Sequence, residues 1–571
     1  MKWKILSKEQ RGSGRITPEE IIALLLQNRG LKTKKEQEAF LNPSLKELDR
    51  DFFDKKQLKA AIDLIKKAIK ENGLIIVYTD YDVDGITGGA IIWETLHRLG
   101  ARTLPYVPHR INEGYGMSKK GIDSILAEHP DARLIITVDH GITAVEQTAY
   151  AKEKGLAVII TDHHTVGKEI PEADAVVHTT DLAGSGVAFV FSQRIIESTR
   201  HSDPAEAGKE LRIPPVLRAE SFVLSDDSSE HLALAALGTI ADLVPLTGPN
   251  RVIAKYGLER LNKTKRIGLK ALIEEVGLAN REIGTYEVGF MIAPRINASG
   301  RISHALEALR LLCTNSPRRA RELSRLLNQL NTERQHLLKE VTEHAKSLVV
   351  ADEKLLFIAH ESYHEGVIGL IAGNLVDEFY RPAIVLSKGA LYSKASARSI
   401  SGFNIIEAIR SCSEILVSAG GHPMAAGFTV ETRHLAVIED RLRRVVTEQL
   451  ADDLLERKLR IDRELPLQYI TQELYEMISK LKPYGAGNPE PVFMSRAIDI
   501  IDAAPVGVDK KHLRLRVAQQ GSVFNAIAFN RGDYYMRLSP GEPVDIAYSL
   551  LQNTWNGNTK LELKIRDIKT E

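Results

Sequence analysis

The sequence has little of three features that would set its class at once: cysteine, net charge and long apolar runs. Its two cysteines, Cys313 and Cys412, lie far apart and outside any C-x-x-C spacing. This argues against a disulfide framework and a zinc ribbon, and it favours a reducing compartment. The formal net charge is only +1, so any site for a polyanion must be a local basic cluster.

Export and membrane signals are also missing from the pattern. The N-terminus MKWKILSKEQ has no apolar core of the kind found in signal peptides, and no window approaches about 18 uninterrupted apolar residues. We therefore expect a cytoplasmic protein. The composition, 43% hydrophobic and 26% charged, is that of a globular chain. A chain of 571 residues exceeds what one hydrophobic core supports, so several domains are expected.

The order of apolar and polar segments predicts an α/β protein. Strand-like runs alternate with helical patterns between 74 and 180, which is typical of a parallel sheet, and leucines at helix spacing predict a long helix later. The expected parts are a helical N-terminal cap (1–70), an α/β catalytic domain (71–316), a connecting helix (317–350), a smaller α/β domain (351–454) and a β-barrel such as an OB-fold (455–571). We also expect an irregular insertion or surface helices over 198–230, and a loop over 291–301.

Three acids follow the clearest strand pattern. In LIIVYTDYDVDG (74–85) a β-branched apolar run ends in Asp80, Asp82 and Asp84, and a helical pattern follows Gly85. The carboxyl ends of parallel strands are the usual place for ligand sites. Carboxylates this close repel one another unless a cation holds them ionised, so a divalent metal is expected there. A solvated acidic turn is the alternative.

Further acids and histidines follow the next strands and one helix. They are Asp139 and His140; Asp162, His163 and His164; and Asp242. Neighbouring strand ends converge in a parallel sheet, so these clusters can meet in one crevice. Carboxylates outnumber imidazoles, which suits Mn²⁺ or Mg²⁺, and two ions about 4 Å apart would need one shared acid. Taken singly, each cluster fits a helix cap or a satisfied loop equally well.

Small polar and basic residues predict phosphate binding at two places. The candidates are Arg295, Asn297, Ser299 and Arg301 in the expected loop, and Ser396, Arg398, Gly420, Gly421 and His422 in the smaller α/β domain. An extended loop would point its alternate residues to one side, and glycines let backbone N–H groups approach an anion. An ordinary basic loop and a Gly-rich turn used for packing are the alternatives.

Other candidates are weaker. His364 and Glu365, near His360, are expected to cap the next helix rather than to bind a ligand. Aromatic residues of the barrel can stack bases and its basic residues can follow a strand, although aromatics at strand positions more often belong to the core. These residues are Phe524, Phe529, Tyr548, Lys510, Lys511, Arg514 and Arg516.

Taken together, the motifs resemble a known superfamily. D-Y-D-V-D-G (80–85), D-H-G (139–141), D-H-H (162–164) and A-D-L-V-P (241–245) resemble motifs I to IV of the DHH phosphoesterases. R-I-N-A-S-G-R (295–301), G-G-H-P-M-A-A-G (420–427) and P-Y-G-A-G-N-P-E-P (483–491) are similar to segments of the RecJ family of single-strand-specific DNA exonucleases. The resemblance covers nearly the whole chain. It implies a DHH catalytic domain, a DHHA1 substrate-binding domain and an OB-fold.

The resemblance also implies individual roles. It places one metal on Asp82 and Asp139, with Asp80 nearby, and a second on Asp84, Asp139, His163 and Asp242. His164 matches the position that contacts the scissile phosphate in DHH enzymes, so Asp139, His163 and His164 form the expected catalytic group. His140 is counted with the substrate-binding residues. Tyr78 stands where several relatives carry a histidine, which makes Asp80 the expected substitute as a ligand.

The resulting hypothesis is a monomeric exonuclease that uses two Mn²⁺ or Mg²⁺ ions to degrade single-stranded DNA. The 5′-to-3′ polarity, the role in DNA repair and recombination, and the partnership with a helicase and a single-strand-binding protein come from the resemblance. One alternative is a DHH/DHHA1 phosphodiesterase of short oligonucleotides or cyclic dinucleotides, against which the added barrel counts. Another is a non-catalytic replication scaffold, against which the complete set of expected ligands counts.

Overall fold

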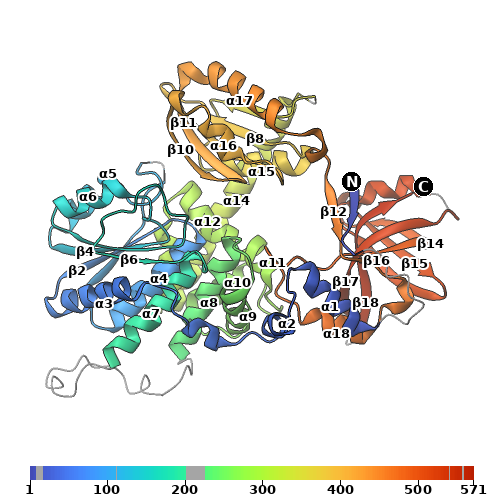
Figure 1. Ribbon diagram of the computed structural model, residues 1–571, viewed down its shortest axis with the longest axis horizontal. Helices are drawn as coiled ribbons and strands as arrows, with labels where there is room; N and C mark the ends of the chain where they lie inside the picture. The colour runs from blue at the N-terminus through green and yellow to red at the C-terminus, as the bar shows by residue number, and fades with distance from the viewer. Residues whose placement is uncertain are drawn as a thin grey trace. The chain divides into compact units, whose positions relative to one another are not determined.

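The chain divides into two compact units in the computed structural model (Figure 1). The structure describes residues 1–7, 17–110, 112–200, 226–350, 352–538, 541–555 and 558–570. The larger unit is Ser44–Leu455, and the smaller combines Met1–Pro43 with Glu456–Glu571. The segment 1–70, treated as one part in the sequence, is therefore shared between the units. Most of the insertion expected over 198–230 lies outside the described residues.

The larger unit begins with a five-stranded, all-parallel sheet in the order β3-β2-β4-β5-β6. Its strands are β2 (Leu74–Thr79), β3 (Thr103–Tyr106), β4 (Ala132–Val138), β5 (Ala157–Asp162) and β6 (Ala175–His178). Its helices are α3 (Lys55–Lys70), α4 (Val83–Arg98), α5 (Lys119–Glu128), α6 (Val145–Glu153) and α7 (Gly184–Arg200). Every residue of β2 is buried because α3, α4 and α7 pack on one face and α5 and α6 on the other. This confirms the predicted parallel sheet.

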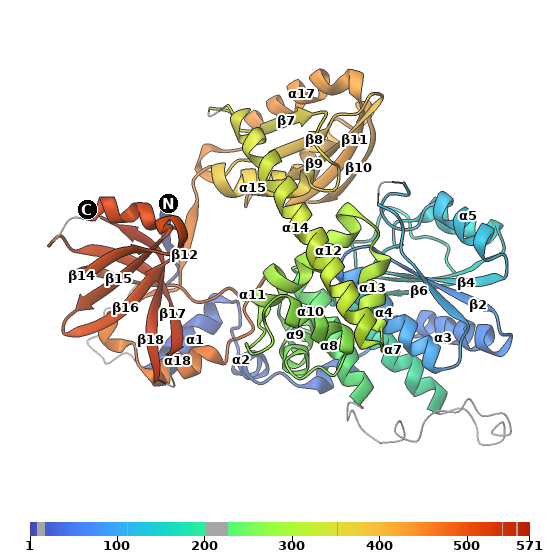
Figure 2. The ribbon, with the colours of Figure 1, turned by 180° about the vertical axis from the view of Figure 1, so that it is seen from behind.

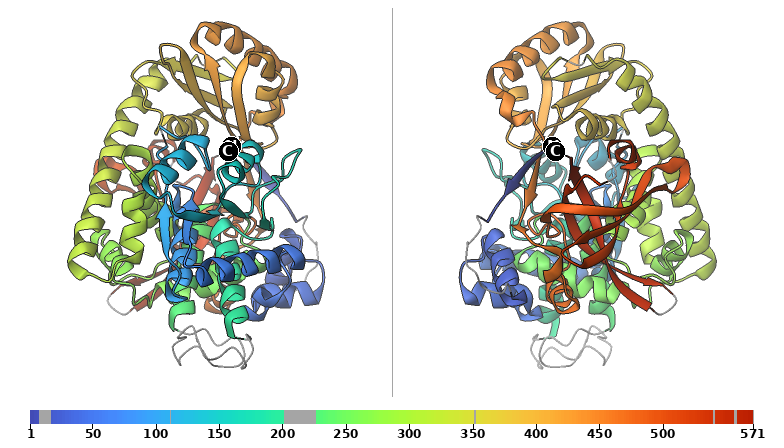
Figure 3. Two further views of the ribbon diagram at one scale, coloured as in Figure 1. Left: turned by 90° about the vertical axis from the view of Figure 1, so that its left-hand side faces the viewer. Right: turned by 90° about the vertical axis from the view of Figure 1, so that its right-hand side faces the viewer.

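A helical layer follows this sheet. It contains α8 (Asp226–Ala241), α9 (Gly248–Leu261), α10 (Ile267–Glu275), α11 (Thr285–Glu287), a π-helical turn (Val288–Ile292), α12 (Ala293–Ile302) and α13 (Leu306–Cys313). The predicted long helix is α14 (Pro317–Ser347), the long yellow-green helix in Figure 3. Among the described residues no helix is long and apolar enough to cross a membrane.

The loop expected over 291–301 is wrong, because these residues form the end of the π-helical turn and α12. Asn, Ser and Gly are weak helix formers, but packing overrides that preference here. Ile296 and Ala298 are fully buried in the core. A Cβ at Gly300 would lie 2.8 Å from the carbonyl oxygen of Tyr81, so glycine serves close packing at this position rather than a turn.

The second part of the larger unit is a mixed five-stranded sheet in the order β10-β11-β9-β8-β7, seen from behind in Figure 2. Its elements are β7 (Leu356–His360), α15 (Ile368–Phe379), β8 (Ala383–Ser387), β9 (Tyr392–Arg398), α16 (Ile405–Arg410), β10 (Leu416–His422), β11 (Ala425–Glu431) and α17 (Leu435–Gln449). The Gly-rich segment 418–427 belongs to the β10–β11 hairpin, with β10 at the edge of the sheet.

The smaller unit is a closed five-stranded barrel, which confirms the predicted OB-like domain. Strand β14 pairs with both β15 and β17, and the circle closes through β16 and β18. The elements are β1 (Lys2–Ile5), α1 (Pro18–Asn28), α2 (Lys34–Leu41), β12 (Lys458–Ile461), β13 (Arg463–Glu464), α18 (Gln472–Ser479), β14 (Phe493–Val506), β15 (His512–Gln519), β16 (Ser522–Ala528), β17 (Val544–Trp555) and β18 (Asn558–Lys569). Tyr548 is fully buried and Phe524 packs on this core, whereas Phe529 is half exposed.

Candidate metal centre

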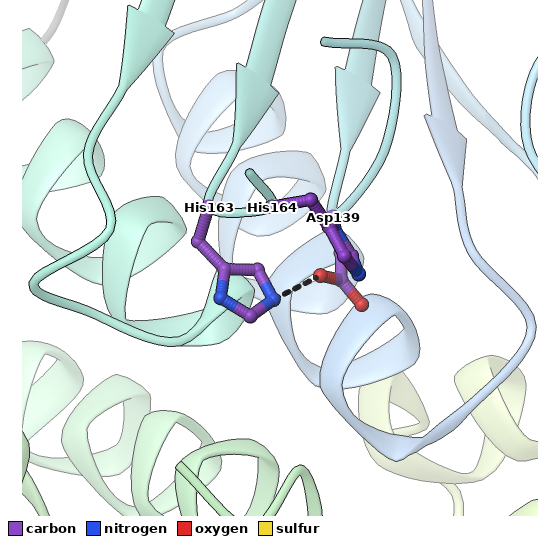
Figure 4. Close-up of side chains that lie close together, drawn as sticks. All are labelled: Asp139, His163 and His164. Atoms are coloured by element: carbon purple, nitrogen blue, oxygen red, sulfur yellow. Dashed lines mark ion pairs between the residues drawn. The ribbon is translucent and has the colours of Figure 1, made fainter. Parts of the chain in front are cut away.

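Three neighbouring strands bring acid and histidine residues to one edge of the parallel sheet. Asp80 follows β2, Asp139 follows β4 and Asp162 ends β5, and the strands lie side by side in that order. Figure 4 shows Asp139 close to His163 and His164, with the His163 ring directed at the Asp139 carboxylate. Convergence of strand ends therefore assembles this cluster.

Backbone N–H groups at two helix N-termini hold two further acids. Asp82 is the N-cap of α4, and its Oδ1 accepts from the N–H groups of Asp84 and Gly85 at 2.9 and 3.1 Å. Asp84 accepts from the N–H groups of Gly184 and Ser185, at 2.7 and 3.0 Å, where α7 begins. These helix ends stabilise negative charge and fix both carboxylates in position.

The possible ligand atoms form three overlapping groups, and within each group they lie no more than 4.8 Å apart. The groups are Asp80, Asp82 and Asp139; Asp84, His163 and Asp242; and Asp139, His163 and His164. Asp139 Oδ1 lies 3.2 Å from His163 Nε2, yet neither atom has a hydrogen-bond partner among the described residues. Buried polar atoms without partners are costly, and a cation between them would satisfy both. The residues fit a divalent ion.

The backbone is shaped around these carboxylates. Asp139 has φ 67°, in the left-handed region that few residues other than glycine adopt, and such strain concentrates at functional sites. A Cβ at Gly184 would lie 2.3 Å from Asp139 Oδ1. A Cβ at Gly238, on α8, would lie 2.4 Å from Asp84 Oδ1. Any larger residue at either glycine would displace a carboxylate.

Burial and crowding make the acids difficult to ionise together. Burial raises the pKa of Asp80 and Asp139 well above the ordinary value, and neighbouring carboxylates raise it further. Burial, followed by the charge of Asp84, raises the pKa of Asp242 to about 9. A cation would hold these carboxylates ionised at neutral pH. Carboxylate oxygens with an imidazole and no sulfur suit Mg²⁺ or Mn²⁺.

The two histidines after β5 differ in protonation. Burial lowers the pKa of His163, and the neutral imidazole is the form that binds metals. Nδ1 of His164 lies 2.7 Å from Asp162 Oδ1. Burial alone would lower the pKa of His164, but the Asp162 carboxylate overcomes this and raises it to about 9. His164 is therefore an imidazolium at neutral pH.

Tyr78 and His140 lie in the interior rather than among the ligand groups. Tyr78 is fully buried, and its hydroxyl donates to Gly116 O at 3.3 Å. His140 Nε2 lies 3.0 Å from Tyr78 O, and burial lowers the pKa of His140 to about 4. The neutral ring thus donates from Nε2 to this carbonyl. His140, expected to bind substrate, is 1% exposed, whereas Asp80 joins a ligand group.

The four residues expected along one side of a loop point in different directions because α12 is a helix. Asn297 Oδ1 accepts from the N–H of Val83 at 3.0 Å, at the start of α4. Ser299 is fully buried. Arg295 lies against α14, where its Nε donates to Asn328 Oδ1 at 2.9 Å. The structure therefore separates Arg295 from Asn297.

Arg301, the fourth of these residues, lies among other arginines. Burial, and then the charges of Arg110, Arg334 and Arg398, lower the pKa of Arg301 to about 10. Burial and Arg110 also lower the pKa of Arg398. Arg301 and Arg398 thus lie near other guanidinium groups, and such a cluster of positive charges is a site that an anion would stabilise.

The remaining predicted residues lie on two strands of the second sheet, the central strand β9 and the edge strand β10. Ser396 and Arg398 are on β9, and Gly420, Gly421 and His422 are on β10. Gly421 has φ 136°, and a Cβ there would lie 2.5 Å from Ala425 O, so the hairpin requires glycine. The ring of His422 stacks on that of His164, with centroids 6.1 Å apart and planes at 19°. The hairpin thus reaches the ligand groups.

Sequence reasoning missed residues that shape the site although their side chains are not metal ligands. Gly184 and Ser185 had a detectable signal, because D-L-A-G-S-G (181–186) precedes an apolar helical pattern, as in helix N-termini that bind anions. Arg110 and Tyr115 lie in an irregular segment with no such pattern. Tyr115 nevertheless places its hydroxyl 3.5 Å from His164 Nε2.

Three family models match the chain. They are the DHH family, N-terminal domain, over residues 74–211, the DHHA1 domain over 349–451 and the RecJ OB domain over 461–567. Together they span the parallel sheet, the mixed sheet and the barrel. Each model therefore coincides with a structural part described above.

Proteins that are similar to this chain along its whole length are described as RecJ exonucleases. The single-stranded-DNA-specific exonuclease RecJ of Bacillus subtilis is 36% identical, over 99% of this chain and 70% of its own length. RecJ of Thermus thermophilus is 32% identical, over 100% of this chain and 79% of its own length. The crystal structure of RecJ in complex with Mn²⁺ from Thermus thermophilus superposes with a TM-score of 0.79 at 30% identity, covering 97% of this chain and 76% of that one. The corresponding Mg²⁺ complex has a TM-score of 0.72 at 29% identity, covering 97% and 75%.

Proposed function

The chain belongs to the RecJ family of single-stranded-DNA-specific exonucleases, and from this premise we propose how the acid and histidine cluster at its strand ends hydrolyses DNA. The observation that carries the proposal is the partnerless pair of Asp139 Oδ1 and His163 Nε2. Because Asp139 belongs to both an acid-only group and a group with histidines, it can bridge two ions.

The proposed ligand sets follow the observed groups. One ion would be held by Asp80, Asp82 and Asp139, and the other by Asp84, His163 and Asp242. Asp139 would join the second set as well, because its Oδ1 lies 3.2 Å from His163 Nε2. Two such ions supply activation of a water molecule and neutralisation of charge on the phosphoryl group. The helix N-termini that hold Asp82 and Asp84 keep these carboxylates oriented before substrate enters.

The chain's own donors complete the site. The imidazolium of His164, held by Asp162, can donate a charge-assisted hydrogen bond to a phosphate oxygen as negative charge develops. Arg301 and Arg398, with Arg110, offer the anion site for a phosphate of the strand. We propose that Ser396 and the β10 hairpin residues Gly420, Gly421 and His422 add donors to this site. Both of the proposed ion sites and the anion site lie within one structural unit.

Two alternatives receive less support. A phosphodiesterase of short oligonucleotides or cyclic dinucleotides needs only the two α/β parts, and this chain also has a closed barrel that matches the RecJ OB domain. A scaffold without chemistry has no need for a strained Asp139 or a partnerless buried ligand pair.

The finer features of the function rest on family membership. We propose 5′-to-3′ polarity, a cytoplasmic monomer, a role in DNA repair and recombination, and cooperation with a helicase and a single-strand-binding protein. Preference for a single strand would follow if both the barrel and the crevice bind an extended backbone.

Digestion of DNA labelled at either end tests the function. With Mn²⁺, we expect short products from the 5′ end of a single strand, no loss of blunt duplex, and no activity in EDTA. Equal digestion of duplex, or activity that survives EDTA, would overturn the proposal. Release from the 3′ end would overturn the polarity alone.

A further inference from the structure

Two large aromatic side chains stand exposed just before the helix that carries Asn297 and Arg301. Tyr286 is 63% and Phe290 70% exposed, and their rings stack with centroids 4.9 Å apart and planes at 28°. They lie on α11 and the π-helical turn, which run directly into α12. Such turns are rare and occur often at functional sites. An exposed aromatic pair gains little from folding but offers a flat apolar surface to a ligand.

A line of arginines connects this pair with the anion site. Arg334, on α14, lies close enough to Arg301 to lower that residue's pKa. Burial, and then the charge of Arg295, lower the pKa of Arg334 itself. Arg295 in turn donates from Nη1 to Met291 O, in the residue next to Phe290. The basic groups thus run from Arg301 along the α12–α14 contact toward the aromatic pair.

Two polar atoms along this line have no hydrogen-bond partner among the described residues: Arg334 Nε and Asn331 Oδ1. Asn331 is 1% exposed. Arg334 forms no ion pair among the described residues, so its guanidinium can bind a phosphate.

We propose that Tyr286, Phe290, Arg295 and Arg334 form a binding track for the part of the DNA strand that lies outside the metal centre. Bases would stack on the two rings while phosphates follow the arginines. Stacking accepts every base because each has a π-face, so the track needs no sequence preference. This deepens the proposed function, because it names where an undigested strand is held between cleavage events.

The track predicts that substrate binding depends on the length of the strand, which the metal centre alone does not predict. We expect a substrate of two or three nucleotides to bind at the metal centre and the anion site without reaching the aromatic pair, whereas a long strand would engage both. Loss of the track should therefore weaken the binding of long substrates and leave the hydrolysis of short ones unchanged. It should also shorten the run of nucleotides removed before the strand dissociates.

The experiment compares the full-length protein with Tyr286→Ala/Phe290→Ala on 5′-phosphorylated (dT)20 and (dT)3, with Mn²⁺. We expect the KM for the 20-mer to rise at least about tenfold, while kcat/KM for the trinucleotide changes less than about twofold. Tyr392→Ala is the matched control, because Tyr392 is an aromatic residue 54% exposed on β9. It should leave both substrates unaffected.

The arginine part is tested by salt. Arg334→Gln should reduce by about one the slope of the logarithm of 20-mer affinity against the logarithm of salt concentration. Arg325→Gln, on an exposed position of the same helix, is the control and should leave the slope unchanged.

Photocrosslinking of the unmodified protein gives an independent readout. A 20-mer carrying 5-iododeoxyuridine at successive positions should crosslink to Tyr286 or Phe290 beyond the first nucleotides. An unchanged KM for the 20-mer in the double variant, together with no crosslink at Tyr286 or Phe290, would overturn the proposal of a DNA-binding track. The aromatic pair would then be a surface that binds a protein. Failure of the wild-type protein to cleave either substrate would instead overturn the proposed function.

Discussion

The carboxylate of Asp139 and the imidazole of His163 face each other across 3.2 Å without sharing a hydrogen bond. Asp139 is held there at φ 67°, and His163 is kept neutral by burial. Two buried polar groups held this close together without a hydrogen bond mark a site that a cation would complete.

Asp139→Asn should reduce turnover of single-stranded DNA at least about 10³-fold, because the only acid common to the two proposed ion sites loses its charge. Mn²⁺ should raise the melting temperature of the wild-type protein but not of this variant, since binding to the folded state stabilises it. Calorimetry with and without Mn²⁺ checks this. Asp63→Asn, which removes an exposed partner of Lys59, is the control and should behave as the wild type. Normal turnover in Asp139→Asn would contradict the bridging role.

Gly184→Ala should lower kcat about 10²-fold while the protein stays folded. The added Cβ would lie 2.3 Å from Asp139 Oδ1 and force the carboxylate out of position. Steady-state kinetics and circular dichroism measure the two effects. Gly373→Ala on α15, where a Cβ meets nothing within 4 Å, should leave kinetics unchanged. Equal kinetics in both variants would show that Gly184 does not position Asp139.

His164→Gln should lower kcat about 10²- to 10³-fold and leave KM and Mn²⁺ binding nearly unchanged. The loss removes a charged donor that the pKa of about 9 keeps protonated at neutral pH. Asp162→Asn should have a similar effect, because Asp162 holds His164 in that state. Loss of Mn²⁺ binding in His164→Gln would instead make His164 a ligand.

Glu94→Gln should lower the free energy of unfolding by about 3 kcal/mol at pH 7, because it breaks a buried ion pair. Burial by itself would raise the pKa of Glu94, but hydrogen bonds from His231 and Arg266 hold it below its ordinary value of 4.5. The stability from this pair is therefore fully present above pH 4.5 and is lost as pH falls below it. In urea unfolding, the difference in the free energy of unfolding between variant and wild type should be smaller at pH 4 than at pH 7. A constant difference would contradict the assignment.

The sequence was most informative where chemistry and strand pattern coincide. A β-branched run ending in acids predicted both β2 and the first ligand group, and the order of strands predicted that Asp139 and His163 would meet. The family resemblance was confirmed by the matching domain models. Individual ligand roles remain predictions that the experiments above address.

Sequence reasoning failed where tertiary contacts overrule local preference. Asn297, Ser299 and Gly300 suggested a loop, but Asn297 binds the N–H of Val83 and Gly300 permits close packing on Tyr81, so the segment is helical. Because the segment is a helix, Arg295 lies against α14 instead of beside Asn297. Contacts between segments far apart in the chain leave no periodic trace in the sequence.

Anomalous diffraction from crystals containing Mn²⁺ tests the central claim most directly. We expect two peaks about 4 Å apart at the edge of the parallel sheet, with one oxygen of Asp139 near both ions, His163 on one of them and Asp80 on the other. A single peak, two peaks without Asp139 between them, or ions bound elsewhere in the chain would contradict the two-metal account.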